Sequence, residues 1–237
     1  EIPSVQSILH KKWLFNAIVI GISFIILFYL IALTAQKITI SVATISNKMS
    51  MVIPILSGIL IFGETLTIWK MTGILLAVAG VYFASLKEGA LSVDRKYIYL
   101  PFLVFTGNGL IEAFLKFTQA NALSIEELDL FLAVLFLVAF VSGILYNVSF
   151  FNNINHVVRS MIWGIILGFP NYGSIYFLMK TLEYSNLESS VVFPVNNISI
   201  VVLSSLLSYF FFKEHFNIKN KLGIAFSISA IILIVIS

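Results

Sequence analysis

Residues 47–73 read NKMSMVIPILSGILIFGETLTIWKMTG, and a related stretch, NNISIVVLSSLLSYFFFKEHFNIKNKLG, returns at residues 196–223. The first seven residues of the two stretches match at an offset of 149. Each stretch then continues as an apolar run, a short polar turn and the start of another apolar run. Glu64 and Glu214, in the two turns, each precede a glycine by nine positions. The chain therefore contains an internal repeat within apolar segments, a pattern typical of membrane transporters.

The rest of the chain is equally apolar. Its 237 residues are 59% hydrophobic and 11% charged, and a soluble protein of this size cannot bury so many apolar side chains. Apolar runs of about 20 residues are long enough to cross a hydrocarbon core of about 30 Å, so we expect the chain to lie in a lipid bilayer. The net charge of +3 is small and lies in the loops. Nucleic acid is therefore not an expected partner.

The apolar runs predict eight membrane helices. Runs of this length favour helices, because the strands of a membrane barrel are about ten residues long and alternate in polarity. Connections such as 36–38 and 63–67 are short, so neighbouring helices are expected to be antiparallel. The predicted spans are 13–35, 39–62, 68–87, 97–119, 128–147, 158–181, 187–212 and 218–236.

The polar stretch 87–96 (KEGALSVDRK) is the best candidate for a junction between two halves. We therefore predict a first repeat over residues 1–90 and a second repeat over residues 91–237. Three predicted helices precede the junction and five follow it, so the first repeat is expected to lack its first two helices. Because five is odd, the two repeats are expected to insert in opposite orientations. The fold class is thus an all-α polytopic helical bundle with an inverted five-plus-five helix repeat and a binding site between the repeats.

Short motifs recur within both halves. The first half carries A-L-T at 32–34, Ser41-Val42-Ala43, Pro54, the G-E turn at 63–64, Gly73 and the A-G pair at 79–80. A weaker copy in the second half consists of T-L-E-Y-S at 181–185, Ser190, Pro194, Lys213-Glu214 and Gly223. With these motifs the chain resembles, over essentially its whole length, the EamA family of the drug/metabolite transporter superfamily. The resemblance implies a ten-helix inverted-repeat transporter whose central cavity moves small metabolites by alternating access.

The span 97–119 carries a polar stripe. Asn108, Glu112 and Lys116 are spaced four residues apart, so they lie within about 80° of one another around the helix. A charge at the centre of a span costs at least about 2.5–3.5 kcal/mol, so each one needs an explanation. In one interpretation the stripe lines a cavity, where Glu112 binds a substrate ammonium or cycles a proton. In the other, Glu112 forms an ion pair with Lys116, which extends towards the membrane surface.

A second polar stripe surrounds Lys48, ten residues into its predicted span. Asn47 precedes Lys48, and the offset of 149 relates Lys48 to Asn197. Inverted repeats would bring these two stripes together across their symmetry axis. Lys48 then either offers a positive charge to an anionic substrate or forms a structural pair with Glu112, and the two hypotheses do not exclude each other.

The span 158–181 contains Pro170 near its middle, followed by Asn171 and Tyr172. A proline inside a helix leaves a backbone carbonyl without its usual donor, and such breaks are tolerated in membranes where a cavity or a neighbouring helix compensates. Asn171 and Tyr172 are therefore candidate cavity residues. Hydrogen bonding between helices is the alternative role.

Glu64 and Glu214 are predicted to cap helices rather than to bind substrate. Each lies at a turn just before a helix start, where a carboxylate accepts free N–H groups and interacts favourably with the helix dipole. The three histidines, His10, His156 and His215, lie far apart without a second ligand at suitable spacing. No metal, cofactor or catalytic residue is therefore expected.

These observations predict a secondary transporter for a small polar metabolite, with an amino acid as one candidate substrate and proton coupling as one candidate mechanism. The alternative is a membrane-embedded enzyme acting on a lipid-linked substrate, which would need clustered acids or histidines at one membrane surface. A composition rich in Ile, Asn, Lys and Phe points to a bacterial inner membrane. The predicted substrate-binding residues are Lys48, Asn47, Asn108, Glu112, Asn171, Tyr172 and Asn197.

Overall fold

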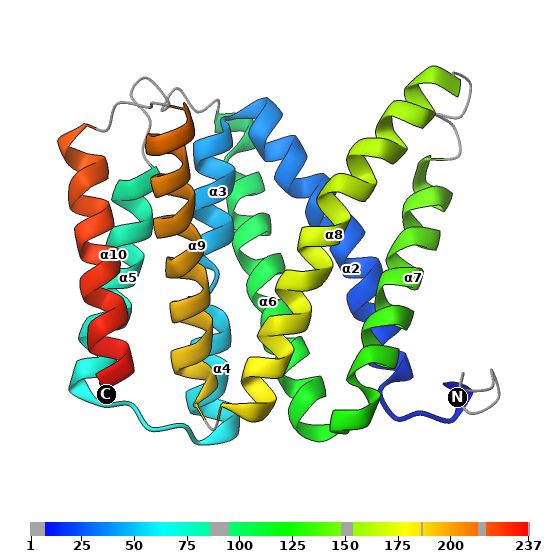
Figure 1. Ribbon diagram of the computed structural model, residues 1–237, viewed down its shortest axis with the longest axis horizontal. Helices are drawn as coiled ribbons and strands as arrows, with labels where there is room; N and C mark the ends of the chain where they lie inside the picture. The colour runs from blue at the N-terminus through cyan, green and yellow to red at the C-terminus, as the bar shows by residue number, and fades with distance from the viewer. Residues whose placement is uncertain (1–7, 86–94, 148–153, 186, 213–216, 237) are drawn as a thin grey trace. The chain divides into compact units, whose positions relative to one another are not determined.

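The computed structural model describes residues 8–85, 95–147, 154–185, 187–212 and 217–236, and in these ranges every regular element is a helix (Figure 1). The chain is an all-α polytopic membrane protein, as predicted. Two short 3-10 turns, η1 (Arg95–Tyr97) and η2 (Ile125–Glu127), precede α6 and α7. The α-helices are α2 (Leu14–Lys37), α3 (Ile40–Met49), α4 (Val52–Phe62), α5 (Ile68–Ser85), α6 (Tyr99–Asn121), α7 (Leu128–Asn147), α8 (Ile154–Tyr184), α9 (Ser189–Phe212) and α10 (Ile218–Ile236).

Seven helical segments in the described residues are long and apolar enough to cross a membrane, with α3 and α4 together forming one of them. The remaining predicted span, 68–87, corresponds to α5, which is apolar but shorter. α5 has 18 residues, and at about 1.5 Å per residue it is close to the thickness of a hydrocarbon core. The predicted and observed helices therefore agree in place, and their bounds differ by a few residues.

The predicted span 39–62 is not one continuous helix, because it is interrupted between α3 and α4. Pro54 has no N–H group, so the carbonyl of Ser50 lacks its usual donor four residues later. Ile53 N donates to Ser50 O instead, at 2.9 Å. Met51 N donates to Lys48 O at 3.4 Å, which leaves the carbonyl of Asn47 available to other donors. The break lies in the middle of an apolar segment.

The chain forms two compact units, each built from two separate stretches of the sequence. One unit contains residues Glu1–Ile26 and Phe114–Asn186, and the other contains Leu27–Ala113 and Leu187–Ser237. Each unit therefore combines segments from both halves of the sequence. α2 and α6 contribute to both units.

The first unit is organised around Trp13 at the start of α2. Its indole is fully buried, packs edge-on against Phe131 with ring centroids 5.8 Å apart, and donates from Nε1 to Glu127 Oε2 at 3.1 Å. Glu127 also forms an ion pair with Lys11. A polar tip on an aromatic ring needs such a partner when it is buried, so these contacts fix α2 against η2 and α7.

In the second unit, α5 and α10 pack closely through small residues. A Cβ atom added at Gly80 would lie 2.8 Å from Ser227 N, and one added at Gly73 would lie 2.6 Å from the Ile234 side chain. A Cβ atom added at Gly223 would lie closer still to the backbone of Ala84. Small residues let helix backbones approach each other, which is the usual basis of helix packing in membranes.

Candidate functional site

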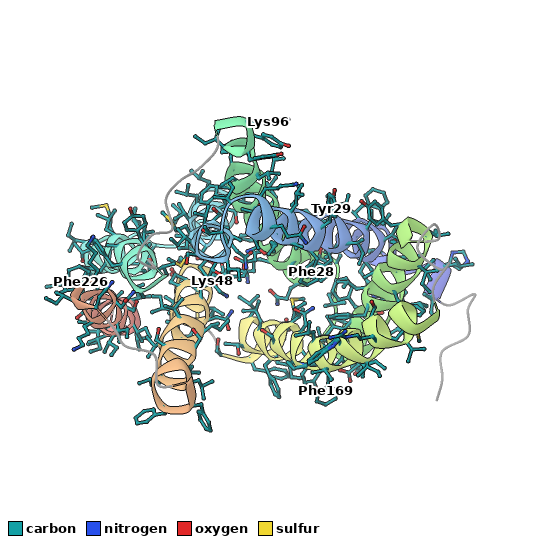
Figure 2. All side chains as sticks on the ribbon, turned by 90° about the horizontal axis from the view of Figure 1, so that it is seen from above. Phe28, Tyr29, Lys48, Lys96, Phe169 and Phe226 are labelled. Atoms are coloured by element: carbon teal, nitrogen blue, oxygen red, sulfur yellow. The ribbon has the colours of Figure 1, made fainter. Side chains whose placement is uncertain are left out.

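Lys48 and Asn197 join α3 to α9 in the second unit. Lys48 Nζ donates to Asn197 Oδ1 at 3.3 Å, and Figure 2 shows Lys48 on the side of α3 that faces α9. Asn197 is only 2% exposed, and its amide nitrogen donates to Phe193 O, one turn earlier in α9, at 3.1 Å. The second bond orients the Asn197 amide so that its oxygen points to the lysine.

Asn108 connects α6 to the break between α3 and α4. Its Nδ2 lies 3.2 Å from Asn47 O and 2.6 Å from Ser50 Oγ, within hydrogen-bonding distance of both. Ser50 Oγ also donates to Asn47 O, so the carbonyl left without a helical donor is satisfied by two side chains. A Cβ atom at Gly109 would lie 2.8 Å from Ser50 O. Glycine at position 109 therefore allows α6 to approach the backbone of the break.

Glu112 lies one turn after Asn108 on the same face of α6. Asn108 Nδ2 donates to Glu112 Oε1 at 3.0 Å. Glu112 and Lys48 attract each other electrostatically, although the two direct ion pairs among the described residues are formed elsewhere. The carboxylate is therefore held by the Asn108 amide and is attracted by Lys48 without a direct ion pair.

Two acceptor atoms of this cluster have no hydrogen-bond donor. Asn47 Oδ1 and Glu112 Oε2 are both buried, and no hydrogen bond of standard geometry from a described residue reaches either atom, although the Asn197 amide interacts with the Glu112 carboxylate. Leaving a buried polar atom unsatisfied costs about 1–3 kcal/mol, and more for a charged group. Structures rarely keep such atoms without a reason, so the cluster has an unused capacity to accept hydrogen bonds.

The structure thus brings together five of the seven predicted binding residues in one cluster of the second unit. They are Asn47, Lys48, Asn108, Glu112 and Asn197. Asn171 and Tyr172 belong to the first unit, where the Tyr172 ring lies 5.4 Å from Phe136 and 6.0 Å from Tyr176. Ser50 was not predicted, although Pro54 four residues later signals that the backbone at Ser50 is irregular.

Lys116, the last residue of the predicted stripe on α6, and Gln119, three residues further on, make contacts in the first unit. Lys116 Nζ donates to Gln119 Oε1 at 3.0 Å, and Gln119 Nε2 donates to Glu183 on α8. The predicted stripe is therefore divided. Its first part faces the break in the helix, and its last part links α6 to α8.

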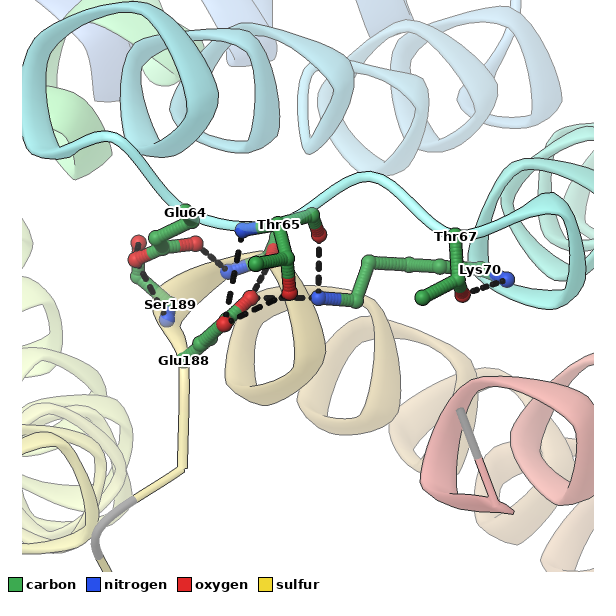
Figure 3. Close-up of polar contacts among 7 residues, drawn as sticks. Glu64, Thr65, Thr67, Lys70, Glu188 and Ser189 are labelled. Carbon is green, nitrogen blue, oxygen red and sulfur yellow. Dashed lines mark hydrogen bonds and ion pairs between the residues drawn. The ribbon is translucent and has the colours of Figure 1, made fainter.

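Glu64 caps the start of α9 (Figure 3). Its carboxylate accepts from Ser189 N at 2.8 Å and from Ser190 N at 2.7 Å, and also from the Ser189 hydroxyl. The sequence predicted that Glu64 would cap the helix that follows it, but Thr67 caps α5 by accepting from Lys70 N at 3.1 Å. Glu64 therefore caps a helix whose first residue, Ser189, lies 125 positions later in the chain. Glu214, the second predicted cap, lies outside the described residues.

Glu188, at the foot of α9, binds the same connection between α4 and α5. It forms an ion pair with Lys70, which is 2% exposed, and accepts from Thr65 Oγ1 at 2.9 Å. Lys70 also donates to Thr65 O at 2.8 Å. The hydrogen bond from Lys70 lowers the pKa of the Glu188 carboxyl below its usual value, against the opposing effect of burial. Two carboxylates, Glu64 and Glu188, therefore hold the connection between α4 and α5 against the start of α9. No local sequence pattern predicted this pairing.

Comparison with known proteins gives two similarities. Residues 2–86 match the model of the EamA-like transporter family, which confirms for this segment the resemblance seen in the sequence. An uncharacterised protein of Haemophilus influenzae is 30% identical over 189 residues, which make up 78% of this chain and 63% of that protein. The chain therefore matches less than two thirds of the length of this relative.

Proposed function

We propose that this chain, whose residues 2–86 match the EamA-like transporter family, works as part of a secondary transporter that moves a small polar metabolite by alternating access. The observation that carries the proposal is the buried polar cluster at the break between α3 and α4. A broken helix at membrane depth is tolerated where it lines a binding site, and its free backbone groups commonly take part in binding. The family match supplies the class of protein, and the cluster supplies the candidate site.

The composition of the cluster supports binding over a purely structural role. A structural pair would be expected to satisfy both charges directly, because an uncompensated buried charge is costly. Here Lys48 donates to a neutral amide, and one oxygen of Glu112 has no donor among the described residues. Ionisable groups inside a membrane protein that are not fully paired usually mark a pathway for a substrate or an ion.

The contacts also support the proposed inverted repeat. Lys48 bonds to the residue 149 positions later, which is its own equivalent in the repeat, and a residue that contacts its equivalent lies close to a two-fold axis. The contacts of α5 with α10 are reciprocal in the same way. Gly73 meets Ile234, and Gly223 meets Ala84, so a shift of 150 positions converts one contact into the other. Because the start of each helix meets the end of its partner, the two equivalent helices run in opposite directions.

The proposal extends to the bacterial inner membrane as location and to Glu112 as the group that would couple transport to protons. A carboxylate that is buried near a cation can bind and release a proton as its surroundings change. Proton coupling predicts that Glu112→Gln, supplied with enough substrate to offset any loss of affinity, still transports but no longer responds to a pH gradient.

Reconstitution tests the function directly. The purified protein is placed in liposomes loaded with unlabelled amino acids, organic acids or amines, one class at a time, and uptake of the labelled compound by counterflow is measured. We expect accumulation for at least one class, and loss of accumulation in Lys48→Ala. The matched control is Lys12→Ala, because Lys12 is exposed and lies outside the cluster. No accumulation of any class, or equal loss in both variants, would contradict the proposal.

A further inference from the structure

We infer that the cluster around Glu112 recognises a zwitterion with a primary ammonium group, such as an α-amino acid. Glu112 Oε2 and Asn47 Oδ1 bind the ammonium, and Lys48 binds the anionic group. The inference rests on the proposed function and specifies the substrate class of the same site.

The first argument concerns hydrogen-bond donors. Asn47 Oδ1 and Glu112 Oε2 are buried acceptors that receive no hydrogen bond from the described residues. Both belong to residues held by Asn108, which donates to the backbone carbonyl of Asn47 and to the other oxygen of Glu112. A primary ammonium has three N–H groups on one atom, so one ligand group can supply both missing donors.

The second argument concerns acceptors. Lys48 also has three N–H groups, and among the described residues one acceptor, Asn197 Oδ1, binds it at 3.3 Å. A bond from an ammonium to a carboxylate is shorter and about twice as strong as a bond between neutral groups. An anionic group of the ligand can therefore replace or supplement the Asn197 amide with a gain in binding energy.

The third argument concerns net charge. Lys48 and Glu112 have opposite signs when ionised and attract each other, so the pair is neutral before a ligand binds, whether both are ionised or the proton of Lys48 has passed to Glu112. A ligand that carried only a positive or only a negative charge would leave one buried charge uncompensated, which is costly. A zwitterion keeps the sum at zero and gives each charged residue an opposite partner. A quaternary ammonium is excluded because it has no N–H to donate.

The test uses matched probes on the purified full chain. The probes have two carbon skeletons, and the zwitterions of the two series are L-leucine and L-phenylalanine. Each is compared with its decarboxylated amine, its deaminated acid and its N-trimethyl derivative, and binding is measured as the shift in melting temperature relative to the ligand-free protein. We expect at least one zwitterion to raise the melting temperature. We expect its deaminated acid and its trimethyl derivative to bind at least about tenfold more weakly.

Variants identify the residues. Glu112→Gln and Asn47→Leu should each weaken binding of the zwitterion by about tenfold or more, because each removes an acceptor for the ammonium. Lys48→Asn should weaken binding of the zwitterion but not binding of its decarboxylated amine. Glu126→Gln is the matched control, since Glu126 is exposed and lies outside the cluster. Each variant is compared with its own ligand-free melting temperature, and Asn47→Leu tests the ammonium site independently if Glu112→Gln does not fold.

Three results would overturn the inference. They are no shift in melting temperature with any primary amine, equal binding of a zwitterion and its deaminated acid, or equal loss of zwitterion binding in Glu112→Gln and Glu126→Gln. The outcome is separable from that of the proposed function. Binding of a zwitterion without counterflow would count against transport and leave the recognition site standing. Counterflow of a solute that has no amino group would support transport and refute the zwitterion site.

Discussion

Lys48 donates a hydrogen bond to Asn197, and the two residues are separated by the 149 positions that relate the two similar stretches of the sequence. Two-fold symmetry alone would place identical side chains at this contact. The chain instead pairs a lysine with an amide, and the lysine attracts the Glu112 carboxylate. The difference between the two stretches therefore supplies the group that offsets the charge of Glu112.

The effects of Lys48 and Glu112 on the stability of the protein should be coupled. Lys48→Asn leaves the Glu112 carboxylate without a nearby cation, so we expect it to lower the melting temperature. The double variant Lys48→Asn/Glu112→Gln should recover part of this loss, with a coupling energy of about 0.5–3 kcal/mol. Thermal unfolding of the four proteins in one detergent measures the cycle. Strictly additive effects would show that the two residues do not interact.

Gly109 should not tolerate a side chain. A Cβ atom there would lie 2.8 Å from Ser50 O and 2.7 Å from Ile53 Cβ, so Gly109→Ala must displace α6 or the break. We expect a loss of about 1–3 kcal/mol, as in other overpacked sites, together with weaker ligand binding. Gly107→Ala on the same helix is the control, because its nearest neighbour, Leu27 Cδ1, would lie at 3.4 Å. If both variants unfold at the same temperature, the close approach has no energetic role.

Glu64 should matter for the start of α9. Glu64→Ala removes the acceptor for the N–H groups of Ser189 and Ser190, and loss of a helix cap costs about 0.5–2 kcal/mol. Glu64→Gln retains one side-chain oxygen and should lose less. Hydrogen exchange followed by mass spectrometry should show faster exchange at the first turn of α9 in Glu64→Ala, with the end of α10 as an internal reference. Unchanged exchange at Ser189 and Ser190 would contradict the capping role.

Acidification should weaken the contact between Glu188 and Lys70. Lys70 lowers the pKa of Glu188 below its ordinary value of 4.5, so the folded state holds the ionised form more strongly than the unfolded state does. This stabilisation is fully present above about pH 4.5 and is lost as the pH falls through the lower value of the folded state. Melting temperatures measured from pH 7 downwards should therefore fall less in Glu188→Gln than in the unchanged protein.

A residual pH dependence is expected in that variant, because Lys11 lowers the pKa of Glu127 in the same direction. Glu126→Gln is the control and should follow the unchanged protein. If the melting temperatures of Glu188→Gln and Glu126→Gln depend on pH in the same way, the ion pair does not stabilise the fold.

The places of the helices could be predicted from the sequence, because run length and flanking polar residues determine where a segment can cross a bilayer. The contact between Lys48 and Asn197 was also within reach, since the repeat offset relates the two residues. The break between α3 and α4 was missed because an apolar run gives no sign of its internal hydrogen bonds. Pro54 is the one local sign of the break in the sequence.

The partner of Glu64 could not be predicted, because capping from the sequence assumes that a carboxylate acts on the next helix. Thr67 already caps α5, which leaves Glu64 to a helix that is distant in the chain. The ion pair of Lys70 with Glu188 spans 118 positions and has no counterpart in the repeat pattern. Contacts of this kind depend on how the helices pack.

The reciprocal contacts of α5 and α10 have a consequence for how such a chain can change over time. Gly73 meets Ile234, and Gly223 meets Ala84, so each helix fills the space that the other leaves open. A larger side chain gained on one helix has to be matched by a smaller one on the other. The exposed faces of the two helices can therefore diverge independently, whereas along this contact they have to evolve as a pair.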